Sequence, residues 1–124
     1  MDRFWLKRYP PGVPADVDVN RYRSLKEVIE TGCQQFADRD AFLHMGHRLS
    51  YRELDQRSAH FGAWLQHRAG MKPGDRIAIM LPNVLQYPVV MYGALRVGMT
   101  VVNTNPLYTA TELEHQLRDS GAEV

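Results

Sequence analysis

A strand–helix–strand pattern over residues 75–106 constrains the fold of this chain more than any other feature of its sequence. The pattern comprises an apolar run at 76–81, a helical segment at about 86–97 and a β-branched run at 100–104. Pro82 and Asn83 end the first run, and Gly98 stands where glycine commonly ends a helix. Because two strands joined through a helix are parallel, we predict an α/β fold with an open, mainly parallel sheet.

Two details of this stretch predict how the sheet is covered. Both predicted strands are apolar along most of their length, which is typical of strands buried on both faces, so we expect helices on both faces of the sheet. Gly93 lies in the middle of the predicted helix, where glycine costs about 1 kcal/mol relative to alanine. We therefore expect the helix to approach the sheet closely at Gly93.

Three further helices are predicted from their first turns. Each follows a Ser or Thr that has Glu three residues later, the capping-box pattern in which each side chain binds the other residue's backbone amide. The boxes are Ser24–Glu27, Ser50–Glu53 and Thr109–Glu112. They predict helices at 25–37, from 51 to the stop at Gly70 and from 110 to the stop at Gly121. Between the first two helices, residues 41–45 and 48–50 predict a small hairpin.

We divide the chain into an extended N-terminal arm, residues 1–23, and an N-terminal α/β subdomain, residues 24–124. The arm is predicted from its prolines and its lack of any clean period. Residues 122–124 follow a helix-ending glycine, so we expect them to begin the next parallel strand, cut off at its first residues. An open sheet edge exposes unpaired backbone groups, and we therefore expect a homodimer or a swapped oligomer.

The composition excludes several classes of function. The 124 residues carry a net charge of +1 without any block of like charge, so no nucleic-acid partner is expected. Cys33 is the single cysteine, which excludes an internal disulfide, fits a reducing compartment and predicts a buried side chain. No segment has the pattern of a signal peptide or of an uninterrupted membrane span. We therefore expect a soluble, cytoplasmic protein.

The aromatic residues of the arm leave two interpretations open. Phe4, Trp5 and Tyr9 lie among basic residues and suit a peripheral contact with the inner membrane. Alternatively, these side chains pack on the domain or on a partner subunit. We favour packing, because a membrane-binding helix needs a periodic apolar face and Pro10-Pro11 prevents one.

The residues themselves form no recognisable catalytic centre. The nine glycines are isolated and make no phosphate-binding loop. His44 and His47 have a metal-ligand spacing but no third ligand nearby, so solvated turn residues are favoured over a metal site. The other candidates have structural explanations: Cys33, Ser58, His60, His67 and Ser120. We therefore predict no catalytic residue and no metal ligand within this stretch.

One functional inference comes from the order of the elements. Ligands of open α/β sheets bind beyond the carboxyl ends of the strands. These ends carry Pro82-Asn83 and the loop at 103–108, which is rich in asparagine and contains Tyr108. Asn and Pro are also ordinary turn residues, so turn chemistry and ligand contact both remain open for these loops.

Three segments carry a family resemblance along nearly the whole chain. They are WLKRYPPGVP at 5–14, FLHMGHRLSYRELDQRSAHFGAWLQ at 42–66 and MLPNVLQYPVVMYGALRVGMTVVNTNPLYTATELEHQLRDSGA at 80–122. Together they resemble the N-terminal part of bacterial long-chain fatty acid–CoA ligases, which are members of the adenylate-forming superfamily. NPLYT followed by EL and HQL is specific for the long-chain acyl branch, whereas the strand-PN-helix-GA pattern is common to the superfamily.

The resemblance implies a ligase that uses ATP, magnesium and CoA. A fatty acid attacks ATP to give an acyl-adenylate and pyrophosphate, and the CoA thiol then displaces AMP. The family's phosphate loop, ribose-binding aspartate and catalytic lysine lie downstream of the matched region, so no catalytic residue is carried over. In relatives, the loop matching Asn105, Pro106, Leu107 and Tyr108 lies near the nucleotide end of CoA. Ala110 replaces a proline common there, and both residues suit a first helical position.

Two functions of different classes remain. In the first, the chain is an incomplete N-terminal subdomain of an adenylate-forming enzyme and is inactive alone, because the adenylation machinery is missing. In the second, it is a free-standing, non-catalytic binding or interaction module derived from the same fold. The reading frame distinguishes them: a frame that continues past Val124 favours the enzyme, and a natural stop favours the module.

Overall fold

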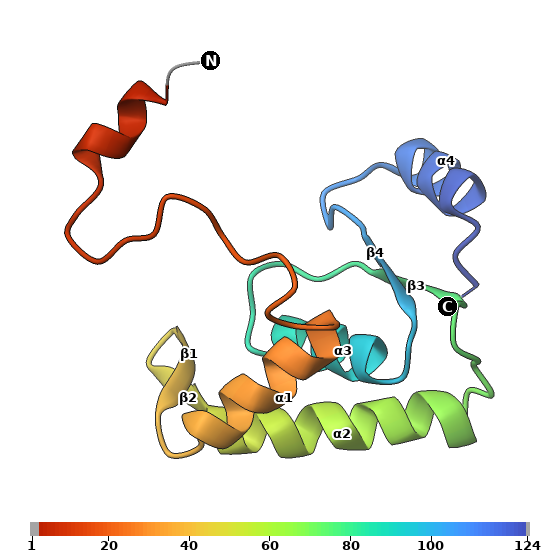
Figure 1. Ribbon diagram of the computed structural model, residues 1–124. Coiled ribbons are helices and arrows are strands. Elements are labelled where there is room, and N and C mark those ends of the chain that lie inside the picture. Colours follow the sequence, from red (N-terminus) through yellow and green to blue (C-terminus); the bar gives the residue numbers. More distant parts are fainter. Residues whose placement is uncertain (1–2, 124) are drawn as a thin grey trace.

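The computed structural model describes residues 3–123, and Figure 1 shows their arrangement. The chain forms a 3-10 helix at Phe4–Arg8, the helices α1 (Leu25–Gln35), α2 (Tyr51–His67), α3 (Gln86–Arg96) and α4 (Ala110–Ser120), and the strands β1 (Asp40–His44), β2 (His47–Ser50), β3 (Arg76–Ile79) and β4 (Thr100–Asn103). β1 and β2 form an antiparallel hairpin, and β3 and β4 form a parallel pair. The predicted α/β class, the hairpin and the strand–helix–strand unit are confirmed.

The parallel pair β3–β4 is covered by helices on both faces. In its register Arg76 pairs with Thr100 and Ile79 pairs with Asn103. Helix α3 packs on both strands, and Ile77 and Ile79 are buried. Figure 1 shows α4 on the opposite side of the strands from α3. The two faces are covered unequally, because α4 contains no buried residue.

The second edge of β3 is occupied by the segment that follows α4. On the β4 side, the carbonyl oxygen of Asp75 accepts a hydrogen bond from the amide of Thr100 at 2.9 Å. Successive carbonyls of a strand point to opposite edges, and that of Arg76 accepts a hydrogen bond from the amide of Glu123 at 3.2 Å. The chain therefore returns beside β3, where the next strand was predicted; Val124 lies outside the described residues.

Helix α3 approaches α2 closely at two glycines. A Cβ atom added at Gly93 would lie 2.7 Å from the carbonyl oxygen of Ser58, and one added at Gly62 would lie 3.0 Å from the carbonyl oxygen of Gly93. These positions leave no room for a side chain. The prediction that Gly93 brings its helix close to the sheet was wrong, because the face of α3 that carries Gly93 lies against α2.

The core consists of two apolar clusters. The first joins α2, α3 and the sheet through Leu65, Met71, Ile77, Ala94 and Met99. The second joins α1, the hairpin and α2 through Cys33, Leu49 and Leu54. Cys33 is 3% exposed, which confirms that its side chain is a buried apolar element.

An ionic network centred on a largely buried arginine joins α1, α2 and α3. The side chain of Arg96, at the end of α3, is 12% exposed. Its guanidinium donates to the hydroxyl of Ser58 at 3.1 Å, pairs with Asp55 and lies 3.3 Å from the carboxylate of Glu30. Ser58 is fully buried on the otherwise apolar face of α2 and donates to the carbonyl oxygen of Asp55 at 3.1 Å. The network therefore satisfies the polar groups at the contact between the helices.

Two of the three predicted capping boxes are complete, those at 50–53 and 109–112. At α1 the hydroxyl of Ser24 accepts from the amide of Glu27, but the Glu27 carboxylate binds the amide and the guanidinium of Arg23. The prediction of a complete box at Ser24 was wrong, because Arg23 offers this carboxylate a charged donor one residue earlier.

The N-terminal arm extends away from the rest of the described chain (Figure 1). Where an extended segment was predicted, Phe4–Arg8 form a 3-10 helix that ends before Pro10. None of residues 3–23 is buried, so the prediction that their aromatic side chains pack on the domain was wrong, and packing on a partner subunit stays a prediction. Phe4 and Trp5 contact each other, with ring centroids 5.4 Å apart.

The predicted boundary between the arm and the subdomain at residue 23 stays a prediction. Of the helices within residues 3–123, none has the length and apolar character that a membrane span requires.

Candidate functional site

The carboxyl ends of β3 and β4 lie at the same edge of the sheet, and the chain leaves them in opposite directions. Helix α3 follows β3 on one face, and α4 follows β4 on the other (Figure 1). Ligands of open α/β sheets bind beyond the carboxyl ends of the strands, where the connecting helices pass to opposite faces. The region of the strand ends between Pro82-Asn83 and the loop at 103–108, called the crevice below, is therefore the candidate functional site.

Asn103 connects both diverging helices to the end of β4. Its side-chain oxygen accepts a hydrogen bond from the hydroxyl of Tyr87, in the first turn of α3, at 2.7 Å. Its carbonyl oxygen accepts one from the side-chain amide of Gln116, on α4, at 3.2 Å. The adjacent Thr104 is buried. The polar groups at the crevice are thus held in place by contacts from three elements.

Residues Asn105, Pro106, Leu107 and Tyr108 form a tight turn beside the crevice. The side-chain oxygen of Asn105 accepts from the amide of Leu107 at 3.0 Å, and its carbonyl oxygen accepts from the amide of Tyr108 at 3.1 Å. Both bonds are ordinary turn chemistry of asparagine, so that interpretation is confirmed for this residue. Leu107 is 86% exposed at the tip of the turn. Contact of the four residues with a ligand stays a prediction.

A cavity of about 530 Å³ lies along α4 beside this turn. It is lined by Tyr108, Thr111, Glu112, His115, Gln116, Asp119 and Ser120. Hydrogen bonds from the backbone amide and the hydroxyl of Thr109 hold the pKa of the Glu112 carboxyl below its usual range. Glu112 therefore stays ionised at neutral pH, and Tyr108 and Gln116 link the cavity to the strand ends.

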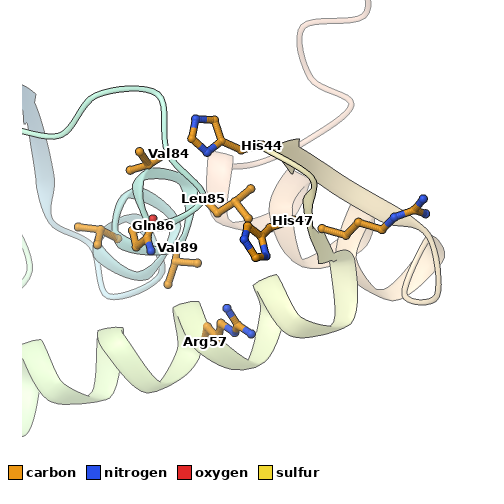
Figure 2. Close-up of a pocket in the computed structure, with 9 residues that line it drawn as sticks. His44, His47, Arg57, Val84, Leu85, Gln86 and Val89 are labelled. Atoms are coloured by element: carbon orange, nitrogen blue, oxygen red, sulfur yellow. The ribbon is translucent and has the colours of Figure 1, made fainter.

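A second cavity, also of about 530 Å³, lies between the β1–β2 hairpin and the start of α3, as Figure 2 shows. It is lined by His44, His47, Arg48, Arg57, Val84, Leu85, Gln86, Val89 and Val90. His44 is half-buried and His47 is exposed. The two histidines, predicted to be solvated turn residues, therefore face a common cavity with two arginines.

The described residues contain no recognisable centre for catalysis. Within residues 3–123, no group of three or more His, Cys, Asp or Glu is placed to hold a metal ion. Burial raises the pKa of the Cys33 thiol above its ordinary value, and a buried thiol of this kind is unreactive. Burial likewise raises the pKa of the Tyr92 hydroxyl. These residues do not fit magnesium or the phosphates of ATP, and no reaction step is derived from them.

The sequence matches a family model described as AMP-binding enzyme over residues 29–124. The chain belongs to this family. The match includes the crevice, both cavities and all four helices except the first turn of α1. The resemblance found in the sequence is therefore confirmed at the level of the family.

Curated relatives of this chain include long-chain-fatty-acid–CoA ligases from several bacteria. That of Yersinia pestis is 54% identical over 122 residues, which cover 98% of this chain and 22% of the relative. That of Haemophilus influenzae is 43% identical over 122 residues, with the same shares covered. The chain thus spans about a fifth of the length of the curated relatives that it matches.

Solved structures of similar fold include the N-terminal subdomain of Klebsiella oxytoca NpsA. Its TM-score to this chain is 0.77 at 23% identity, covering 82% of this chain and 26% of that one. The crystal structure of VinN gives a TM-score of 0.76 at 29% identity, covering 80% and 26%. The predicted architecture of an adenylate-forming N-terminal subdomain is confirmed.

The cavity at the hairpin was missed from the sequence. Its lining comes from the hairpin, from α2 and from the start of α3, and no spacing pattern brings Arg57 together with Gln86. One local signal was present at the start of α3. Leu85, at the position before this helix, is not a capping residue, so no side chain caps the helix where it borders the cavity.

Proposed function

We propose that the protein is the N-terminal part of a long-chain fatty acid–CoA ligase. Such a ligase joins a fatty acid to ATP to give an acyl-adenylate and pyrophosphate, and then transfers the acyl group to the thiol of CoA with release of AMP. The 54% identity to the Yersinia pestis ligase, which extends over 98% of this chain, carries the proposal.

In this proposal, residues 1–124 supply a scaffold and one wall of the site and do not catalyse the reaction alone. The sequence has no glycine-rich phosphate loop, and the described residues offer no metal ligand set. ATP and magnesium would therefore be held by the larger share of the ligase, which these residues do not represent.

The loop at Asn105, Pro106, Leu107 and Tyr108 is proposed to contact the nucleotide end of CoA. Its place beside the crevice and the exposure of Leu107 support this role. The local bonds of Asn105 fix the shape of the turn, so its exposed residues can contact a ligand without reorganisation of the backbone.

We propose a cytoplasmic location, with peripheral contact to the inner membrane through the arm, and assembly as a homodimer or a swapped oligomer. The exposed Phe4 and Trp5 and the basic Lys7 and Arg8 support a surface contact of the arm. The edge of β4 that faces away from β3 has no paired strand among the described residues, which supports pairing between chains.

A chimera tests the proposed activity. Residues 1–124 replace the matching segment of the Yersinia pestis ligase, and release of AMP is measured with palmitate, ATP, magnesium and CoA. We expect activity within about tenfold of the parent ligase, because about half of the replaced residues are identical and a tenfold change corresponds to only about 1.4 kcal/mol.

Two controls complete this experiment. The 124-residue protein alone is expected to release no AMP above the blank. A second chimera carries the matching segment of triostin synthetase I of Streptomyces triostinicus, 33% identical over 100 residues, and separates a general scaffold effect from one specific to the ligases. A folded first chimera that lacks activity would contradict the proposal, as would turnover by the 124 residues alone.

A further inference from the structure

The crevice at the strand ends lies between two walls that are held by different bonds. The first, called the α3 wall, consists of Pro82-Asn83 and the first turn of α3. The second, called the α4 wall, consists of the loop at 103–108 and the first turn of α4. A side chain caps the helix of the α4 wall, whereas no side chain caps the helix of the α3 wall. The α3 wall therefore depends on contacts from outside its own helix.

The start of α3 is tied to the end of β4 by one hydrogen bond. The hydroxyl of Tyr87 donates to the side-chain oxygen of Asn103 at 2.7 Å. Leu85, before the helix, cannot act as a cap, and the first turn contains no acidic residue. A helix start of this kind leaves backbone amides without side-chain partners. The bond from Tyr87 thus joins an uncapped helix start to a strand that is fixed in the sheet.

The α4 wall is fixed by its own bonds and by a second bond to Asn103. Its helix starts with the complete capping box of Thr109 and Glu112. The turn before the helix is closed by the two local bonds of Asn105. The side-chain amide of Gln116 then donates to the carbonyl oxygen of Asn103 at 3.2 Å. The turn and the helix are therefore fastened together to the end of β4.

Asn103 thus joins both walls through separate groups, its side-chain oxygen to α3 and its carbonyl oxygen to α4. The sheet holds its backbone, because Asn103 pairs with Ile79 and the amide of the adjacent Thr104 donates to the carbonyl oxygen of Ile79 at 3.0 Å. Its side chain therefore offers Tyr87 an acceptor at a fixed place. Removal of the Tyr87 hydroxyl would release the α3 wall and leave the α4 wall in position.

We propose that Tyr87 and Asn103 are positioning residues for the transfer of the acyl group to CoA. Their hydrogen bond fixes the distance between Pro82-Asn83 and the loop at 103–108, and thus the width of the crevice. This role rests on the proposed function, in which the loop contacts the nucleotide end of CoA. ATP and magnesium are assigned to the rest of the ligase, so release of the α3 wall should weaken the use of CoA and leave formation of the acyl-adenylate unchanged.

Tyr87→Phe in the chimeric ligase tests this role, because it deletes only the hydroxyl. The KM for CoA, measured from the release of AMP, is expected to rise about threefold to tenfold, as the loss of one hydrogen bond allows. Exchange of pyrophosphate into ATP, measured with palmitate and without CoA, should change by less than about twofold. A role in folding alone would instead lower both half-reactions together and leave the KM for CoA unchanged.

Two further variants complete the kinetic test. Tyr92→Phe is the matched control, because Tyr92 lies on the same helix but packs on the apolar cluster that contains Cys33. It should leave the KM for CoA unchanged. Asn103→Ala removes the acceptor of the bond, and a double variant with Tyr87→Phe should raise the KM for CoA no further than Asn103→Ala alone.

The width of the crevice can be measured directly in the 124-residue protein. Asn83→Cys and Leu107→Cys place spin labels at two exposed positions, one on each wall, in a Cys33→Ala background. Double electron–electron resonance then gives the distribution of distances between the labels. We expect a broader distribution after Tyr87→Phe and an unchanged one after Tyr92→Phe, because only the first substitution removes the bond between the walls.

Several results would overturn the proposal. They are an unchanged KM for CoA in Tyr87→Phe, an equal loss in both half-reactions, additive effects in the double variant, or an unchanged distribution of distances. Failure of the proposed ligase function gives a different result, an unsubstituted chimera that catalyses neither half-reaction. That result would remove the role in the use of CoA as well, whereas the distances would still show whether the bond fixes the two walls.

Discussion

The two faces of the β3–β4 sheet carry helices of equal length, 11 residues each, that are held very differently. On one face, α3 lies against α2 at Gly93 and Gly62, where a Cβ atom would meet backbone at 2.7–3.0 Å. On the other, α4 has no buried residue and is linked to the strands by a hydrogen bond from Gln116 and, beyond its end, by one from the amide of Glu123. The burial of a helix therefore depends on what a second layer supplies and not on the length of the helix.

The difference also concerns how charge is used. On the α3 side, Arg96 is nearly buried and connects three helices through Ser58, Asp55 and Glu30. On the α4 side, Arg118 pairs with a neighbour on its own helix and both side chains are exposed. The α3 side is therefore a packed interface between helices, whereas α4 has few contacts with the rest of the described chain.

Substitution at the helix crossing should have the largest effect. Gly93→Ala places a methyl group within 2.7 Å of the Ser58 carbonyl oxygen and should destabilise the protein by about 3 kcal/mol, as overpacking against backbone does. Gly32→Ala is the matched control, because Gly32 is also helical and has nothing within 4 Å of an added Cβ atom. It should stabilise by about 0.5–1 kcal/mol. Urea unfolding followed by circular dichroism measures both, and equal effects would refute the close contact.

Removal of the buried arginine should rank second. Arg96→Met leaves the Ser58 hydroxyl and two carboxylates without their partner, and we expect a loss of about 2 kcal/mol, less than for fully buried pairs because the carboxylates are partly exposed. Arg118→Met should change stability by less than about 0.5 kcal/mol. A double variant with Asp55→Asn that loses no more than Arg96→Met alone would show that the two groups act together.

Truncation of an apolar side chain on α4 should cost less. Leu117 is only half-buried, and Leu117→Ala should destabilise by about 1 kcal/mol, whereas Leu65→Ala in the core should cost about 3 kcal/mol. The same urea titrations compare the two variants. A cost at Leu117 equal to that at Leu65 would mean that α4 is buried as firmly as α2.

The smallest effect should be a pH dependence of stability that the capping boxes of α2 and α4 share. Hydrogen bonds from the backbone amide and the hydroxyl of Ser50 lower the pKa of Glu53, and those of Thr109 lower the pKa of Glu112. A lowered folded-state pKa gives stability that is complete above the ordinary value of about 4.3 and is lost as pH falls through the folded-state pKa.

Glu53→Gln and Glu112→Gln should therefore each reduce the loss of stability on acidification below about pH 4.5, by similar amounts. Urea midpoints measured between neutral pH and about pH 3 give the slopes. A flat profile in the unsubstituted protein would contradict the assignment. A change for one variant alone would show that the two boxes differ in the folded protein.

The sequence predicted the elements because their signals are local. Capping residues, apolar periodicity and the glycines at 70, 98 and 121 located the helices and strands to within a few residues. The capping box predicted at Ser24 lacks only the hydrogen bond from the Ser24 amide to the Glu27 carboxylate, since the neighbouring Arg23 competes for that carboxylate. The parallel pairing of β3 and β4 also followed from element order alone, because parallel strands joined by helices leave few topologies.

The contacts between elements could not be predicted in the same way. The unusual glycine at position 93 was recognised, but its partner is α2 and not the sheet, because spacing within a helix does not reveal which neighbour faces which side. Arg96 and Asp55 are 41 residues apart, and no local pattern joins them. Ser58 carried a weak signal, as a hydroxyl on an apolar face requires a buried partner.

The crossing of α2 and α3 also limits how this chain can change. The carbonyl oxygen of Gly93 faces Gly62, so the two positions share one space. A larger residue at one cannot be accommodated by any choice at the other, since both are already at the smallest size available. A larger residue would fit at either position only if a whole helix shifted. The guanidinium of Arg96, which binds α3 to α1 and α2, opposes that shift.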